Sequence, residues 1–437
     1  MLSKEKIGIV WFRNDLRISD HQALLKATET CSKVVCFYCL DDAMFLPTPW
    51  GFKKTAKYRV QFLLETLQQI LQDLEQLNIT LIIETGNTVL ILSHWIKKLS
   101  CTDLFFQKEW TQEEAITENQ LKAQVSPSVQ FHSFYDQFLI HPDDLPFSVE
   151  ALPKVFTEFR KAIEKFSSVR QSIPPINSKS IENKLDFVSP VPSLKDLGYS
   201  PFTQHFHSAF PFKGGSKAAL ERMNSYYWET HKVSYYKKTR NGLIGKDYSS
   251  KFSPWLANGS ISARQLYWEL KRYELEVEKN ESTYWLIFEL YWRDFFKYVS
   301  LKFGNSIFKL SGILQKQYDW KKSLNEFQRW SMGQTSEPFV NASMIELKKT
   351  GWMSNRGRQN TASYLARNMK IDWRIGAAYF ESLLLDYDVH SNYGNWMYVA
   401  GVGNDPRDRV FNVRLQAERY DPHGKFQSIW NQNQLFE

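Results

Sequence analysis

One expected helix, residues 284–303, carries side chains that could do chemistry together. Glu289, Trp292, Arg293 and Phe296 fall at positions i, i+3, i+4 and i+7, so they share one helix face. If the Glu and Arg form an ordinary surface pair at this spacing, they stabilise the helix by only about 0.2–0.5 kcal/mol. A carboxylate and a guanidinium beside a Trp ring could instead recognise a base edge, a phosphate and a stacked ring.

Hydroxyl groups gather in a second segment, residues 235–259, ahead of a helix whose first turn tolerates Pro254. Hydroxyls and backbone N–H groups at a helix start could bind phosphate, although spacing alone favours a capped helix without a ligand. The segment is not a Walker A loop, because Gly242 and Gly245 lie too close together.

Two further segments combine charges with amides and aromatic rings. Residues 350–360 place arginines where a helix begins. These arginines could bind phosphates or a flavin, or they could simply be solvated. Residues 386–396 contain Asp386 and Asp388. Paired acids there could accept hydrogen bonds from a heterocycle, although a solvated, capped loop is the ordinary explanation.

The elements that must position these segments fall into three parts, an α/β unit, a connector and an all-α unit. Residues 1–130 alternate apolar runs, at 7–12, 34–38, 80–84 and 103–107, with amphipathic stretches. This predicts a Rossmann-like parallel-sheet domain, but no G-x-G-x-x-G follows the first run. Prolines and serines from 131 to 205 indicate a long surface connector. Helical periodicity from 206 to 437 predicts a C-terminal helical domain.

Composition narrows the class of protein. The chain has 437 residues, of which 15% are aromatic, so it is long enough for two or three packed units. Its formal charge of +8 favours a polyanionic partner, although a solvated basic surface would give the same number. No signal peptide and no run of 18 apolar residues is present, so we expect a soluble, cytoplasmic protein without membrane contact.

The cysteines indicate neither a disulfide framework nor a metal site. Four cysteines in a chain of this length predict a reducing compartment. Cys36 and Cys39 form a C-x-x-C, but they lie in an apolar run that reads as a buried strand with no second ligand pair nearby. We therefore expect no metal.

Five sequence blocks along the chain occur in an order that is typical of one protein family. Residues 11–17 (WFRNDLR), 236–259, 290–296, 353–360 and 386–407 cover much of the length between them. The first block resembles the N-terminal signature of the photolyase/cryptochrome family, and the others resemble its cryptochrome-DASH branch. The resemblance spans nearly the whole chain.

The resemblance implies that the helical domain binds FAD in a folded conformation. The family's phosphate-side contacts match Tyr236, Ser249, Ser250, Lys251 and Ser253. Its contacts around the flavin ring match Asn355, Arg358, Asp386, Asp388 and Asn392.

The implied activity is blue-light-driven repair of cyclobutane pyrimidine dimers, in which excited reduced FAD donates an electron to the dimer. By the resemblance, Glu289 hydrogen-bonds the dimer, Trp292 stacks on it, Gln359 lines its pocket and Asn355 assists from the flavin side. The family's electron-transfer tryptophans match Trp396, Trp373 and Trp320.

The resemblance also names partners. A pyrimidine dimer leaves an unpaired strand at lower energetic cost than it leaves a duplex, so single-stranded DNA is the expected substrate. Duplex DNA or RNA are expected to be weaker partners. We also expect the protein to be a monomer. The candidate contacts to the nucleic-acid backbone are Lys237, Arg293, Arg356 and Arg407. A folate antenna, 5,10-methenyltetrahydrofolate, is expected on the α/β side, with Glu109 as its contact.

Several positions depart from the family pattern, and rival functions share its scaffold. The departures are Asn341, Ser336, Tyr393 and Ser216, and they bear on local DNA contacts and cavity polarity. The main rival is a blue-light photoreceptor that binds FAD and DNA with little repair, which the short stretch after the last block, ending at 435–437, disfavours. A duplex-DNA photolyase and a dark flavin oxidoreductase are weaker rivals.

Overall fold

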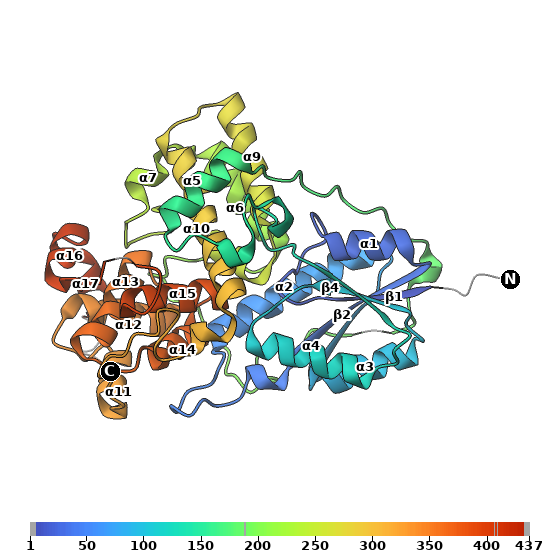
Figure 1. The fold of residues 1–437 in the computed structure, drawn as a ribbon, viewed down its shortest axis with the longest axis horizontal. Helices are drawn as coiled ribbons and strands as arrows, with labels where there is room; N and C mark the ends of the chain where they lie inside the picture. Colours follow the sequence, from blue (N-terminus) through green and yellow to red (C-terminus); the bar gives the residue numbers. More distant parts are fainter. Residues whose placement is uncertain (1–5, 188, 406, 409, 432–437) are drawn as a thin grey trace.

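The N-terminal part of the chain folds around a five-stranded parallel sheet with strand order β3-β2-β1-β4-β5 (Figure 1). The computed structural model describes residues 6–187, 189–405, 407, 408 and 410–431, so the chain end at 435–437 lies outside the described residues. The strands are β1 (Ile7–Trp11), β2 (Lys33–Asp41), β3 (Leu81–Gly86), β4 (Asp103–Gln107) and β5 (Gln130–Phe134). The parallel sheet and its first four strands are confirmed.

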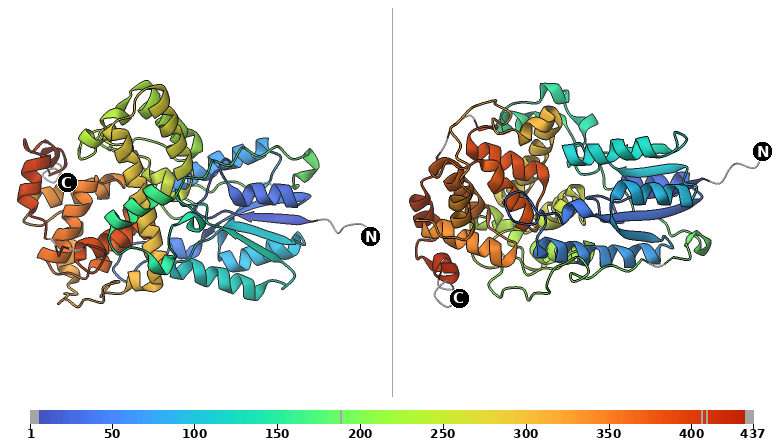
Figure 2. Two further views of the ribbon diagram at one scale, coloured as in Figure 1. Left: turned by 45° about the horizontal axis from the view of Figure 1, so that its top comes forward. Right: turned by 90° about the horizontal axis from the view of Figure 1, so that it is seen from below.

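Helices cover both faces of this sheet, as the near-continuous apolar runs require. Helices α1 (Gln22–Thr30) and α2 (Lys57–Gln76) pack on one face, and α3 (Thr88–Lys98) and α4 (Gln112–Gln124) pack on the other (Figure 2). Cys36 belongs to the core of the first face and Cys39 to that of the second, because a three-residue step along a strand reverses the side-chain direction. The C-x-x-C therefore cannot act as one site, and no metal-binding cluster occurs among the described residues.

The stretch expected to be a connector is more structured than its composition indicated. Strand β5 extends the sheet to Phe134, across the expected boundary at 130. Helix α5 (Phe156–Phe166) buries Phe156, Phe159 and Ile163, which lie at helical spacing, and it packs against the helical domain. Only the later part of this stretch runs over the sheet as an irregular connector. There the Ser189 hydroxyl exchanges hydrogen bonds of 2.7 Å with both backbone groups of Ile83.

The remainder of the chain is helical, as expected. It comprises α6 (Ser216–Asn224), α7 (Tyr236–Thr239), α8 (Ser253–Asn258), α9 (Ala263–Glu276), α10 (Glu281–Phe303), α11 (Leu324–Ser331), α12 (Pro338–Thr350), α13 (Asn355–Ser363), α14 (Trp373–Leu383), α15 (Val389–Ala400), α16 (Val413–Tyr420) and α17 (Lys425–Asn431). Helix α10 is central: a capping box at Asn280 starts it, and it packs against α5, α7, α9 and α15. Within the described residues, no helix could cross a membrane.

Buried charges join the two domains. The Arg264 guanidinium of α9 bonds Asp20 at 2.8 Å and Asp136 at 2.7 Å, and all three side chains are buried. Arg17, from the 11–17 block, donates to the backbone oxygens of Asp20 and Gly259. Burial alone would raise the pKa of Asp136, but the charges of Arg17 and Arg264 lower it below its usual range. We call Arg17, Asp20, Asp136 and Arg264 the interdomain clasp.

Candidate functional site

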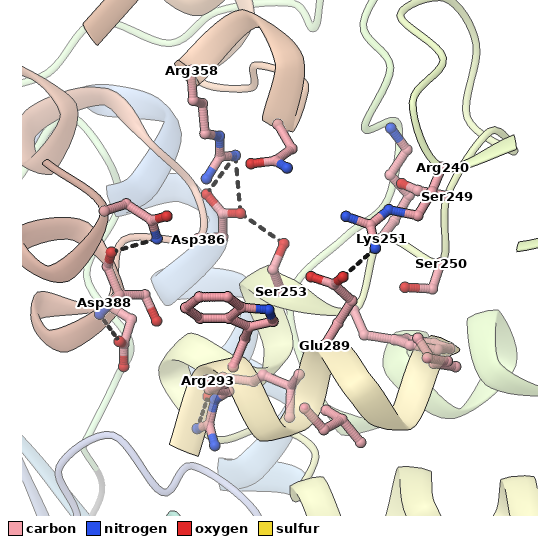
Figure 3. A pocket seen from close by; sticks show the side chains of 18 of the residues that line it. Arg240, Ser249, Ser250, Lys251, Ser253, Glu289, Arg293, Arg358, Asp386 and Asp388 are labelled. Carbon is pink, nitrogen blue, oxygen red and sulfur yellow. Dashed lines mark hydrogen bonds and ion pairs between the residues drawn. The ribbon is translucent and has the colours of Figure 1, made fainter. Parts of the chain in front are cut away.

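A cavity of about 450 Å³ opens within the helical domain and is lined by most of the expected site residues (Figure 3). A smaller cavity of about 100 Å³ shares part of the lining, including Arg358, Asp386 and Asp388, and adds Asn392 and Trp396. The structure thereby brings together segments from α7, α8, α10, α13 and α15 that are far apart in the sequence. The large cavity is lined by the expected residues Tyr236, Ser249, Ser250, Lys251, Ser253, Glu289, Trp292, Arg293, Asn355, Arg358, Gln359, Asp386 and Asp388.

The hydroxyl-rich segment before α8 presents an unpaired cation to this cavity. Lys251 is 2% exposed, has a left-handed backbone (φ +65°), and its Nζ lies 3.3 Å from the centre of the Tyr248 ring. Among the described residues, this Nζ has no hydrogen-bond partner. Burial lowers the pKa of Lys251 well below its ordinary value. A buried ammonium without an acceptor is costly, so an anionic group bound here would stabilise it.

A buried arginine holds the backbone of this segment in place. Arg222 on α6 donates to the carbonyl oxygens of Ser249 (3.0 Å) and Ser250 (3.1 Å) and to the Asp247 carboxylate (2.8 Å). These bonds occupy carbonyl oxygens of the segment. Ser249, Ser250 and Lys251 can therefore present N–H and side-chain donors to an anion, which is the arrangement a phosphate group needs.

An ion pair lies where α13 begins and the α14–α15 loop passes. Arg358 contacts both carboxylate oxygens of Asp386, at 2.9 and 3.0 Å, and Ser253 donates to the same carboxylate at 2.6 Å. Arg358 is further fixed by its bond to the Met353 carbonyl oxygen at 2.9 Å. Two of the residues expected around the flavin ring therefore form an ion pair, which presents charge-assisted donors and acceptors where the linings of the two cavities overlap.

Asp388 has two partners beside this pair. It caps α15 by accepting from the Ser391 N–H at 2.7 Å, and it accepts from the Lys297 Nζ at 2.8 Å. Burial would raise the pKa of Asp388, but the Lys297 ammonium lowers it far below the usual range, so the carboxylate stays charged. Asn392, one turn along α15, donates its amide to the Ala377 carbonyl oxygen at 3.0 Å.

The face of α10 that the spacing indicated forms one wall of the cavity. Glu289 pairs with Arg240 of the α7 segment, and Trp292 stacks on Phe156 at 3.8 Å with an interplanar angle of 12°. Burial raises the pKa of Glu289, while Arg240 and a hydrogen bond from Trp285 oppose that rise. A flat ring and a carboxylate one helical turn apart face the same space.

Arg293 also lines the cavity, but its guanidinium donates to two backbone oxygens, those of Gln137 at 2.5 Å and Leu256 at 3.1 Å. The chain's own carbonyl oxygens therefore hold the Arg293 guanidinium in place. Arg356 is also engaged, because it donates to Asn241 at 2.9 Å and orients Gln359 through a bond of 2.7 Å.

The three expected electron-transfer tryptophans differ in burial. Trp396 is 2% exposed and lines the smaller cavity, Trp373 is fully buried, and Trp320 is half-buried. The Trp396 ring lies 5.0 Å from Phe380 and 6.3 Å from Trp330.

Lys237, Arg407 and Glu109 lie outside the lining of both cavities, as do Arg356, Trp373 and Trp320. Lys237 pairs with Glu281 and lies over the Trp285 ring, and Arg407 is exposed. Glu109 is buried at the domain interface, where Gln107 donates to it at 2.8 Å and His390 lies 4.0 Å away. Burial raises the pKa of Glu109 to about 7.

Sequence reasoning missed several lining residues. Arg240, Tyr248 and Trp352 line the large cavity from positions that no local spacing connects to α10. Trp285 could have been found, because it lies four residues before Glu289 on the same helix face. Among the departures, the Asn341 side chain bonds both backbone groups and the hydroxyl of Thr335, so this amide stabilises a turn.

Comparisons with known proteins agree with this architecture. Family models described as "DNA photolyase" and "FAD binding domain of DNA photolyase" match residues 8–178 and 285–433. These two matches and the cavity define a photolyase-type flavoprotein with an FAD-binding helical domain.

Curated relatives narrow the class further. A cryptochrome DASH of Gloeobacter violaceus is 44% identical over 97% of this chain and 85% of its own length. The Arabidopsis thaliana protein named "Cryptochrome DASH, chloroplastic/mitochondrial" is 43% identical over 98% of this chain and 75% of its own. The crystal structure of a cryptochrome from Synechocystis superposes with a TM-score of 0.92 at 42% identity, covering 98% of this chain and 89% of that one. The chain belongs to the cryptochrome DASH branch of the photolyase/cryptochrome family.

Proposed function

We propose that the protein uses blue light and bound FAD to reverse cyclobutane pyrimidine dimers, preferably in single-stranded DNA. The observation that carries the proposal is the shared cavity, whose lining includes the Glu289–Trp292 wall, the Arg358–Asp386 pair and the unpaired Lys251. One space can therefore hold a flavin nucleotide and a second, flat, uncharged ligand.

The lining fits FAD. Lys251, Ser249, Ser250, Ser253 and Tyr236 offer donors and a positive charge to the phosphates, and the buried Lys251 Nζ lacks any other acceptor among the described residues. Arg358, Asp386, Asp388, Asn355 and Asn392 surround the space left for the ring. When bound in its reduced form, FAD supplies the light-driven electron that splits the cyclobutane ring.

The protein's own contribution on the substrate side is binding and orientation. Trp292 provides a flat surface for the thymine rings, Glu289 provides a carboxyl group for their polar edges, and Gln359, held by Arg356, completes the pocket. Because burial raises the pKa of Glu289, its protonated form is favoured more than usual, and that form can donate a hydrogen bond to a carbonyl oxygen. Arg240 pairs with the same carboxyl group, so this ion pair must weaken when Glu289 binds the dimer.

Electron supply from the surface is proposed for Trp396, Trp373 and Trp320, in that order from the cavity outward. For the nucleic-acid backbone we retain Lys237, Arg356 and Arg407, and we assign Arg293 to holding the domain interface instead. For the folate antenna, the buried Glu109 remains the proposed contact, since a carboxyl with a pKa of about 7 at the domain interface can bond a pterin N–H group.

The test is repair by the purified, anaerobically reduced protein under blue light, with dimer-containing oligonucleotides supplied single-stranded and as duplexes. Light-dependent restoration of thymines should be faster in the single strand and should be lost in Glu289→Ala and Trp292→Ala. Glu276→Ala, on the exposed part of α9, is the matched control and should repair normally. Binding of FAD and DNA with no repair of either substrate would refute the proposal and favour the photoreceptor.

A further inference from the structure

We propose that Trp285, Phe288 and Lys237 form a stacking site for the nucleotide next to the dimer in a single strand. This inference rests on the proposed function and adds a contact that the substrate makes outside the dimer pocket. Trp285 and Phe288 both line the cavity and are both half-buried.

The geometry of the rings supports stacking. Trp285 and Phe288 are stacked on each other, with centroids 4.7 Å apart and planes at 26°. Phe288 meets Phe156 edge-on at 5.1 Å, and Phe156 in turn stacks on Trp292 at 3.8 Å. A continuous wall of aromatic rings thus runs along α10 from the proposed dimer contact toward the start of the helix.

Two cations flank the outer end of this wall. The Lys237 Nζ lies 4.3 Å from the centre of the Trp285 ring, and the Arg240 guanidinium carbon lies 5.9 Å from it. Lys237 is one-third exposed, and its partner Glu281 is 71% exposed, so the pair is open to competition from a phosphate. An aromatic platform beside a positive charge is the chemistry that binds single-stranded nucleic acid without sequence preference.

The position of Trp285 separates it from the flavin-ring end of the cavity. Lys297, which pairs with Asp388, is twelve residues further along α10, and at 1.5 Å per residue this corresponds to about 18 Å along the helix axis. Glu289 lies between them. The ring wall therefore extends past the dimer contact on the side away from Asp388, where a neighbouring nucleotide would lie.

The experiment compares two ligands that differ only in flanking nucleotides. Affinities are measured by fluorescence anisotropy for a labelled single-stranded oligonucleotide with one thymine dimer, and by competition for the dimer dinucleotide, which has no neighbours. Trp285→Ala should weaken oligonucleotide binding about 5- to 150-fold, the range for loss of one base stack, and should weaken dinucleotide binding much less. Trp285→Phe keeps a ring and should retain most of the oligonucleotide affinity.

Lys237→Ala should lower the salt dependence of oligonucleotide binding by about 0.7 in the slope of log K against log salt, the value for one phosphate contact in a single strand. Lys97→Ala, on α3 of the other domain, is the matched control and should leave the slope unchanged.

Equal losses for oligonucleotide and dinucleotide in Trp285→Ala, or equal losses in the Ala and Phe variants, would overturn the inference. Either result would instead indicate that the Trp285 indole acts through its hydrogen bond to Glu289. Failure of the wild type to repair either ligand in light would refute the proposed function. The binding comparison would still decide the stacking site.

Discussion

Substitution of Asp20 by Asn removes one charge from the interdomain clasp without disturbing the backbone. Asp20 has a left-handed conformation (φ +53°), which Asn adopts as readily as Asp, so backbone strain is not introduced. Its carboxylate accepts from Arg264 at 2.8 and 3.0 Å, from the Ser262 hydroxyl at 2.5 Å and from the Ile173 N–H at 2.8 Å. Among the described residues, the variant leaves the buried Arg17 and Arg264 guanidinium groups with Asp136 as their one charged partner.

Removal of one member of a buried charge network costs about 3–5 kcal/mol, because the remaining charges stay buried. With an unfolding entropy of about 2.1 cal/mol/K per residue, this predicts a fall in Tm of about 3–6 °C for a chain of this length. Thermal unfolding followed by circular dichroism measures it. Glu29→Gln, which alters an exposed Lys26–Glu29 pair at 3.6 Å, is the control and should give no measurable shift.

A shift below 1 °C for Asp20→Asn would refute the reasoning, since it would mean that the clasp contributes nothing net to docking. Acid provides a second check. The pKa of Asp136 is lowered in the folded protein, so its contribution is fully present above its unfolded value, about 3.9, and is lost as the pH falls below that. The wild type should therefore lose stability below about pH 4, and Asp136→Asn should flatten that loss.

Three further substitutions test particular contacts. Burial raises the pKa of Glu346 to about 8, so the stability that its protonated carboxyl group contributes is present below about pH 4.5 and is lost as the pH rises. The variant Glu346→Gln should therefore be up to about 3 kcal/mol more stable than the wild type at pH 7 and equal to it near pH 4. Urea unfolding measures this difference. Asp386→Asn removes the charge that faces Arg358 and should weaken FAD binding about 10- to 100-fold in flavin-fluorescence titrations, whereas unchanged affinity would remove the pair from the cofactor site. Gly376→Ala places a Cβ 2.3 Å from the Trp396 ring, so it should destabilise the protein by about 1–3 kcal/mol, although Ala normally favours a helix. A rise in Tm would show that the Trp396 ring is placed differently.

The sequence was most informative about the fold where a pattern repeats over many residues. Apolar runs separated by amphipathic stretches predicted the parallel sheet and four of its strands, because burial on both faces requires such runs. Strand β5 was missed because its five residues are more polar and only half-buried at the sheet edge. Helix α5 was missed because the surrounding prolines and serines dominate the composition, although its three buried apolar residues keep helical spacing.

The candidate site was predictable only where its residues share one element or one family block. The α10 face followed from the i, i+3, i+4 spacing, and most of the other expected residues that line the cavities followed from the resemblance. Pairings between elements did not follow. Arg240 reaches Glu289 across 49 positions, and Lys297 reaches Asp388 across 91, so neither pair has a local signal. Such contacts depend on how the helices pack, which periodicity does not specify.

The α10 block shows why a motif cannot be assigned to function as a unit. Trp292 and Arg293 both line the cavity, but the Arg293 guanidinium donates to the backbone oxygens of Gln137 and Leu256. The next residue, Asp294, accepts from the backbone N–H groups of Leu139 (2.9 Å) and Ile140 (2.8 Å). Consecutive residues on a helix point about 100° apart, so the block can serve substrate binding and domain docking at once. Loss of repair in an Arg293 or Asp294 variant would therefore not identify a substrate contact. Substitutions of Glu289 and Trp292, whose side chains line the cavity, allow that conclusion.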